Sequence, residues 1–176
     1  MRRTIRHILL VAAILSLAGV MGAQQQRKSP HESTSAVIAG KTITIEYGRP
    51  YKKGRKIYGG LVPFDKVWRT GADEATTLTT DADLMVGDIH VPKGTYGLFT
   101  IPTEKTWTLM LNKTAEQWGA FSYDAGQDLG RTAMKISDMG APLEQLTITI
   151  EPTEGNQGTL KIAWEQTVAA TDIVVH

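Results

Sequence analysis

Charged side chains that could bind or transform a ligand are concentrated in one stretch of this sequence, residues 54–78. Arg69 is followed four and five positions later by Asp73 and Glu74. A guanidinium group donates paired hydrogen bonds to a carboxylate or a phosphate, and it can also donate to sugar hydroxyls. A carboxyl group in a cleft can transfer a proton. The three residues therefore define a candidate site with two chemistries, ligand recognition and acid–base catalysis.

The same three residues also have a purely structural interpretation. Arg69 would pair with Asp73 or Glu74 across the turn at Gly71, and Trp68 would plug the end of the hydrophobic core. Neighbouring side chains in an extended segment point to opposite sides, so the two acids are not expected to form an acid–base couple with each other. The structural interpretation is favoured here. The structure has to decide whether Arg69 faces the acids or a ligand.

A basic run precedes these residues. Five positive charges fall within eight residues, and tyrosines alternate with them: Arg49, Lys52, Lys53, Arg55 and Lys56, with Tyr47, Tyr51 and Tyr58. Such a run can recognise an anion or an acidic glycan, although a basic connection is more often only solvated. The predicted ligand-binding surface consists of Arg55, Lys56, Tyr58, Trp68, Arg69, Asp73 and Glu74.

Other chemistries are poorly represented in the sequence. Beyond the N-terminal segment the only histidines are His31, His90 and His176, without the spacing of a metal-binding motif. There is no cysteine and no glycine-rich phosphate loop. No metal, cofactor or catalytic residue is therefore predicted.

The first 23 residues have the pattern of an export signal. Arg2, Arg3 and Arg6 precede an uncharged apolar stretch over residues 8–22, which ends in small residues at Ala23. This stretch is shorter than the roughly 20 residues that cross a bilayer. We expect cleavage after Ala23, a periplasmic or extracellular location, and no stable membrane span after cleavage.

Removal of the signal changes the charge balance. The whole chain carries +1, whereas sixteen basic and eighteen acidic residues, a net −2, remain after residue 23. This charge gives no general attraction to nucleic acid or to an anionic membrane, so no nucleic-acid partner is predicted. About 150 residues suffice for one domain with its own core. We expect a flexible lead over residues 24–35 and a single domain over 36–176.

Hydrophobic residues in this domain recur with a period of two. Four segments alternate in this way, and each puts three large apolar side chains on one face: Ile43, Ile45 and Tyr47; Trp107, Leu109 and Leu111; Leu146, Ile148 and Ile150; Leu160, Ile162 and Trp164. Alternation of this kind is typical of half-buried antiparallel strands, and short turn signals separate the segments. The pattern predicts an all-β, jelly-roll-like antiparallel β-sandwich of nine or ten strands with little helix.

Several sequence blocks resemble a known family. They are "IEYGRP", "KGRKIYGGLVPFDKVWRTGADEATTL", "VPKGTYGLFTIP", "WTLMLNK" and "WGAFSYD", in this order. They are similar to the blocks of the bacterial family DUF2911, over roughly Ser33 to Trp164. The resemblance implies a secreted or periplasmic β-rich domain. It implies no activity, ligand or catalytic residue.

Two functions follow as expectations. The first is an exported module of the bacterial envelope, structural or binding a glycan or a small anionic ligand. The alternative is a hydrolase of an envelope glycan or ester, with Asp73 or Glu74 as acid–base and Arg69 orienting the substrate.

Overall fold

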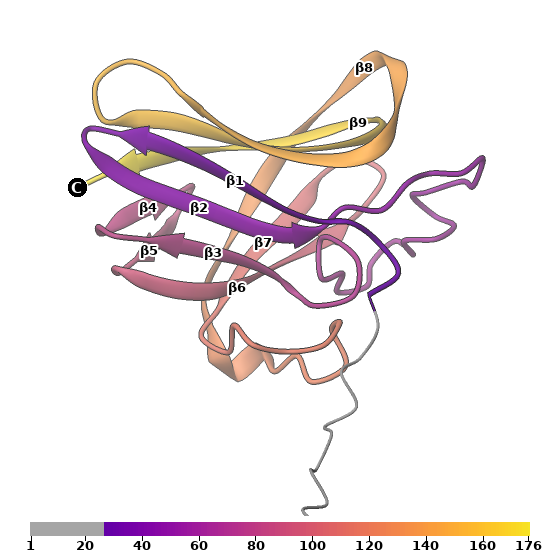
Figure 1. The fold of residues 1–176 in the computed structure, drawn as a ribbon, viewed down its shortest axis with the longest axis horizontal. Coiled ribbons are helices and arrows are strands. Elements are labelled where there is room, and N and C mark those ends of the chain that lie inside the picture. The colour runs from indigo at the N-terminus through magenta and orange to yellow at the C-terminus, as the bar shows by residue number, and fades with distance from the viewer. Residues whose placement is uncertain (1–26) are drawn as a thin grey trace, which may run out of the picture.

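The computed structural model describes residues 27–176 (Figure 1). The predicted export signal and its cleavage site lie outside these residues. The described chain forms nine β-strands and one short 3-10 turn, with no α-helix. The elements are β1 (His31–Ile38), β2 (Lys41–Gly48), β3 (Thr76–Thr80), β4 (Leu84–Val86), β5 (Ile89–Val91), β6 (Gly94–Pro102), β7 (Trp107–Asn112), η1 (Ala125–Gln127), β8 (Asp128–Pro152) and β9 (Gln157–Val175). The all-β prediction is confirmed.

All nine strands belong to one antiparallel sheet. Its order is β1-β2-β3-β6-β7-β8-β9-β4-β5, and β1 and β5 are its two edges. Because the edges are not hydrogen-bonded to each other, the sheet is not closed. The hydrogen bonds thus show one open antiparallel sheet. They do not by themselves show the predicted sandwich or jelly roll.

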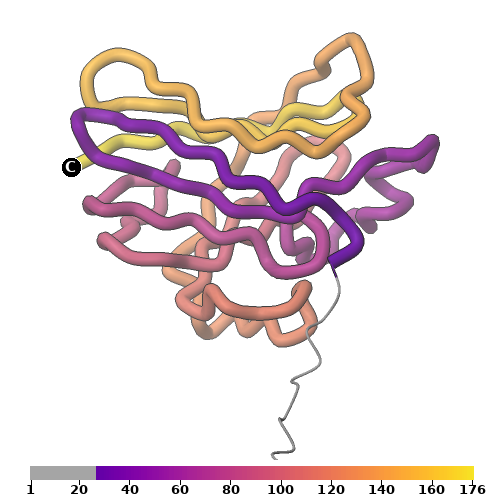
Figure 2. The backbone as a smooth tube through the Cα atoms, viewed as in Figure 1, coloured from indigo at the N-terminus to yellow at the C-terminus, as the bar shows by residue number. Residues whose placement is uncertain are grey.

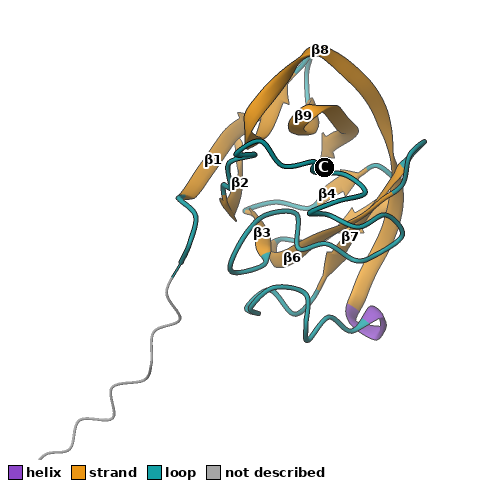
Figure 3. Ribbon diagram, turned by 90° about the vertical axis from the view of Figure 1, so that its right-hand side faces the viewer, coloured by secondary structure: helices purple, strands orange, loops and turns teal. Residues whose placement is uncertain are grey.

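Strand β8 turns the sheet back over itself. Its first part pairs with β7, up to Met134 opposite Trp107. From Lys135 onward it pairs with β9 instead, with register shifts between Asp138 and Thr147. Figures 1 and 3 show the long β8–β9 ribbon arching over the strands that precede it. This bend lets β1, at one edge of the sheet, lie against β8.

The first strand begins earlier than the sequence suggested. Strand β1 starts at His31, within the segment expected to be a flexible lead, and it pairs along its whole length with β2. Only two of its side chains, Ala36 and Ile38, are buried, so its first half carries no hydrophobic alternation. It is ordered by backbone pairing, which a hydrophobic pattern does not reveal.

The predicted inward faces are confirmed. All twelve apolar side chains that alternate in the four segments are buried, and they join one core cluster. The two C-terminal segments pair as the hairpin of β8 and β9, with Pro152 opposite Gly158. The "DAGQD" segment forms the single 3-10 turn.

Strands β6 and β7 are buried on both faces. Phe99 and Met110 point away from the main core and form a second, small cluster with Ala75. The loop between β7 and β8 covers this cluster, and the ring of Tyr123 lies 5.0 Å from that of Phe99. This loop also forms one wall of a hollow described below.

Candidate functional site

The candidate residues lie on the long connection between β2 and β3, residues 49–75. It projects on the right-hand side of the fold in Figures 1 and 2. Although it contains no strand, backbone hydrogen bonds attach it to β8, to β6 and to the loop after β7. The pairs are Lys52 N to Glu144 O, Trp68 with Thr100 in both directions, and Ala75 N to Gln117 O. The connection is therefore an ordered part of the domain.

The backbone of this connection lies very close to the end of β2. The amide of Ala72 donates to the carbonyl of Gly48 at 3.2 Å. A Cβ atom at Gly48 would lie only 2.0 Å from the carbonyl oxygen of Ala72. No residue other than glycine fits there without moving backbone.

Trp68 anchors the connection in the core. It is 8% exposed, and its ring stacks on Trp164 with centroids 6.2 Å apart. Trp107 and Tyr58 meet the same ring edge-on at 6.1 and 6.3 Å. The indole Nε1 donates to the carbonyl of Gly71 at 3.2 Å, so the polar end of the side chain is also satisfied. Trp68 therefore packs into the hydrophobic core, as the structural interpretation of the sequence predicted.

Tyr58 and Lys56 lie apart from the other predicted residues. Tyr58 is buried in the aromatic cluster, and its hydroxyl has no hydrogen-bond partner among the described residues. Burial, together with the negative charge of Glu165, raises its pKa far above the ordinary tyrosine value. Lys56 is exposed. Neither residue lines the hollows described below.

Asp73 holds the N-terminal segment of the described chain. Its Oδ2 accepts hydrogen bonds from the backbone amides of Lys28 at 2.9 Å and Ser29 at 3.1 Å. Asp73 is only 8% exposed and has a φ of 64°, in the left-handed region. Thr70 has a φ of 58° three residues earlier, which is rarer for a β-branched side chain.

Glu74 points to a different place. Its Oε1 accepts a hydrogen bond from Nε of Arg27 at 2.7 Å, and its Oε2 lies 3.9 Å from Nδ1 of His31. Partial burial acts to raise the pKa of Glu74. A hydrogen bond from its own backbone amide and the interactions with Arg27 and His31 outweigh that effect, so the pKa is lowered.

Arg69 pairs with neither acid. Among the described residues its guanidinium forms no ion pair and no side-chain hydrogen bond, and its Nε is shielded from solvent. Burial lowers the pKa of Arg69, while the charge of Asp73 acts at longer range in the opposite direction. The three residues grouped by the sequence therefore do not face one another.

Two adjoining cavities share one wall, and we call them together the basic hollow. One, of about 220 Å³, is lined by Arg69, Trp68, Trp164 and Asp73, and the other measures about 330 Å³. Both share the wall made by Lys28, Ser29, Pro50 and Arg55, and Lys53 borders the second. Four cationic side chains thus line the basic hollow, and its one carboxylate, Asp73, is already engaged by backbone amides. The hollow is locally basic although the chain beyond residue 23 is net acidic.

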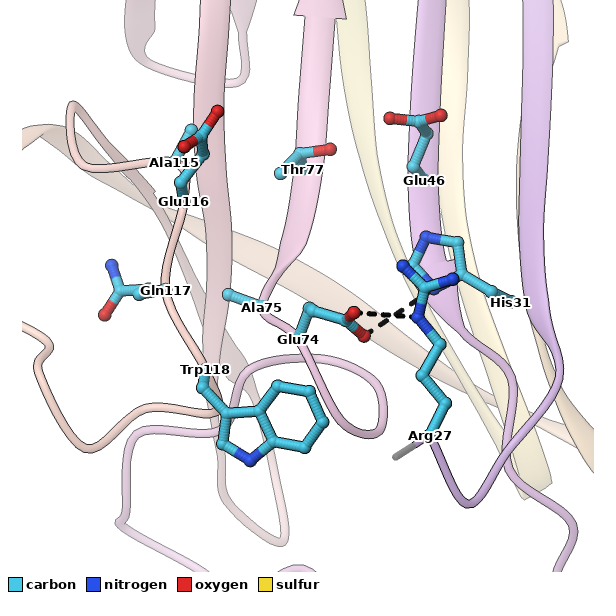
Figure 4. Close-up of a pocket in the computed structure, with 10 residues that line it drawn as sticks. All are labelled: Arg27, His31, Glu46, Glu74, Ala75, Thr77, Ala115, Glu116, Gln117 and Trp118. Carbon is cyan, nitrogen blue, oxygen red and sulfur yellow. Dashed lines mark hydrogen bonds and ion pairs between the residues drawn. The ribbon is translucent and has the colours of Figure 1, made fainter. Parts of the chain in front are cut away.

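A second cavity, of about 350 Å³, lies at Glu74, and we call it the Glu74 hollow. It is lined by Arg27, His31, Glu46, Glu74, Ala75, Thr77, Ala115, Glu116, Gln117 and Trp118. Figure 4 shows Arg27 reaching to the Glu74 carboxylate, with Glu46 and Glu116 on opposite sides of Thr77. Three carboxylates border this cavity. Its charge is therefore opposite to that of the basic hollow.

The predicted surface is thus divided among several environments. Arg55, Trp68, Arg69 and Asp73 line the basic hollow, and Glu74 lines the other cavity. Sequence reasoning missed Lys28 and Trp164 in the first cavity and Trp118 in the second. Lys28 carried no signal because it falls in the expected lead, and Trp164 was assigned to the core, where most of its ring does lie.

No group of three or more His, Asp or Glu side chains within residues 27–176 is arranged to hold a metal ion. No helix in the described part of the chain is long and apolar enough to cross a membrane.

The fold and the two hollows define an all-β domain with one open antiparallel sheet and a long, ordered β2–β3 connection. The family model described as "Protein of unknown function (DUF2911)" matches residues 29–173. The chain belongs to this family. No curated protein and no solved structure matches it.

Proposed function

We propose that this protein is an exported module of the bacterial envelope that binds a small anionic ligand or an acidic glycan in the basic hollow. The observation that carries the proposal is the Arg69 guanidinium, which borders the hollow without a partner among the described residues. Export is inferred from the pattern of residues 1–23. We also infer that the sheet folds over into a two-layer sandwich, because β7 and β9 pair with different parts of β8.

Burial explains why an anion would bind at Arg69. A charged group that is partly removed from water loses solvation, and this loss already lowers the pKa of Arg69. A carboxylate, sulfate or phosphate would replace the lost solvation with charge-assisted hydrogen bonds to the guanidinium fork. Lys28, Lys53 and Arg55 add positive charge along the same wall. Binding should therefore weaken as salt is added.

Tests of this proposal can use three probes: a sulfated heparin oligosaccharide, an oligogalacturonate and inorganic phosphate. At a hundredfold excess over its dissociation constant, a ligand stabilises the folded state by about 2.7 kcal/mol, which a thermal shift detects. We expect at least one probe to stabilise the wild type, and Arg69→Ala to lose most of that effect. Arg69→Lys should recover only part of it, because lysine keeps the charge without the fork.

Lys56→Ala is the matched control, since Lys56 is exposed and lies outside the basic hollow. It removes one charge from the same basic run and should leave the shift intact. Equal stabilisation of wild type and Arg69→Ala, with both proteins folded by circular dichroism, would refute the proposal. A loss of equal size in Lys56→Ala would show that only net charge matters.

The hydrolase alternative receives less support from the geometry. A general acid must hold its proton near the working pH, whereas the pKa of Glu74 is lowered. Asp73 accepts two backbone hydrogen bonds and borders the basic hollow, while Glu74 borders the other cavity. Within the described part of the chain, Asp73 is the one carboxylate that lines the cavity with Arg69.

A further inference from the structure

The cations that line the basic hollow have no acidic partners within the described chain. Other cations of the same basic run do have them. Nη1 of Arg49 lies 3.9 Å from Oε1 of Glu32, and Nζ of Lys52 lies 2.9 Å from Oε1 of Glu165. No such ion pair forms at the four residues that line the hollow: Lys28, Lys53, Arg55 and Arg69. Their positive charges are therefore available to an anion from outside.

The larger of the two cavities is positive without any contribution from Arg69. We call it the Lys53 cavity and the smaller one the Arg69 cavity. The Lys53 cavity, of about 330 Å³, is lined by Lys28, Ser29, Pro50, Tyr51, Lys53 and Arg55. Three of these residues are cationic and none is acidic. Tyr51, which is 40% exposed, adds an aromatic side chain to the same wall.

Arg55 lines both cavities, and backbone carbonyls hold its side chain in place. Its Nε donates to the carbonyl of Lys52 at 2.9 Å, and its Nη2 donates to the carbonyl of Tyr51 at 2.5 Å. A guanidinium group has five N–H donors, so these two bonds leave three for a ligand. Because the side chain is already fixed, less conformational entropy is lost when an anion binds to it.

Lys53 has a backbone conformation that disfavours lysine. Its φ is 49°, the φ of Gly54 is 71°, and the amide of Arg55 donates to the carbonyl of Lys52 at 3.1 Å. These are the features of a type I′ turn, whose central residues both have positive φ and whose preferred pair is Asn–Gly. Lysine at the first central position makes the folded state less stable than asparagine would. Unfavourable backbone angles of this kind cluster at binding sites.

We propose that the basic hollow contains two anion subsites, one at Arg69 and one at Lys53, and that its ligand carries at least two separated anionic groups, as an acidic oligosaccharide does. This inference rests on the proposed function and narrows it. The Arg69 cavity, of about 220 Å³, is smaller than the roughly 300–1,000 Å³ usual for ligand sites. A ligand longer than one unit has to extend from it, and the adjoining Lys53 cavity offers the next counter-charge.

The test is a set of calorimetric titrations with three saccharides: galacturonate, which has one carboxylate, digalacturonate, which has two, and lactobionate, a disaccharide acid with one. We expect digalacturonate to bind the wild type about tenfold more tightly than either of the others, because its second carboxylate adds a contact within the same complex. Lys53→Asn should bring digalacturonate down to the affinity of galacturonate. Its melting temperature should equal or exceed that of the wild type, because asparagine suits the turn.

Lys56→Asn is the matched control, because it removes one positive charge from the same basic run outside the hollow. It should keep the preference for digalacturonate. Equal affinities of digalacturonate and galacturonate, both dependent on Arg69, would overturn the two subsites and leave the proposed function standing. A preference that persists in Lys53→Asn, or tighter binding of inorganic phosphate, a compact anion, would also overturn them. Absence of binding by every probe would refute both proposals.

Discussion

Truncation of Trp68 is the sharpest test of how the β2–β3 connection is held. Trp→Ala substitutions in cores cost about 3–5 kcal/mol. Trp68 is 8% exposed, contacts three aromatic rings and donates one hydrogen bond, which argues for the upper part of that range. Its position at the wall of the basic hollow acts the other way, since water can enter part of the space left behind. We expect Trp68→Ala to lower the free energy of unfolding by about 4 kcal/mol.

Urea denaturation followed by circular dichroism measures this loss. With a slope of about 2 kcal/mol per molar urea for a domain of this size, the midpoint should fall by about 2 M. Trp118→Ala is the matched control, because Trp118 is only partly buried at the rim of the Glu74 hollow. It should cost about 1 kcal/mol or less. A Trp68→Ala midpoint within about 0.5 M of the wild type, or a loss equal to that of Trp118→Ala, would refute the packing role.

Three further predictions concern stability, each read from urea midpoints. Gly48→Ala should lower the free energy of unfolding by about 2–3 kcal/mol, because the new Cβ would meet the Ala72 carbonyl oxygen at 2.0 Å. Gly126→Ala is the control and should cost clearly less, because its new Cβ would meet only a side-chain oxygen, at 3.2 Å. Equal losses of stability in the two variants would contradict the close approach at Gly48. Tyr58→Phe should leave stability unchanged or raise it by about 1 kcal/mol, because it removes a buried hydroxyl without a partner among the described residues, and a clear loss would reveal an unseen hydrogen bond. Glu74 has a lowered pKa in the folded state, so its stabilisation is present above its unfolded pKa and is lost as the pH falls. The wild type should therefore lose more stability than Glu74→Gln between about pH 5 and pH 3, and parallel curves would contradict this.

Much of the fold could be predicted from local pattern. A period of two in hydrophobicity specifies which side of a strand is buried, and this identified β2, β7 and the paired parts of β8 and β9 with their core faces. Strand β1 could not be found in this way, because its first half is held by main-chain bonds with exposed side chains. The bend of β8 also escaped the sequence, since the register shifts between Asp138 and Thr147 interrupt the alternation.

The sequence by itself singled out residues 54–78 and predicted Arg69, Asp73 and Glu74 as candidate site residues within them. It could not determine which way each side chain faces. Tertiary structure decided this by bringing Lys28 and Ser29 to Asp73, across 45 and 44 positions of the chain, and Arg27 to Glu74 across 47. The two neighbouring acids line different cavities, Asp73 the basic hollow and Glu74 the other. Such contacts depend on where distant backbone lies after folding, and local spacing carries no information about that position.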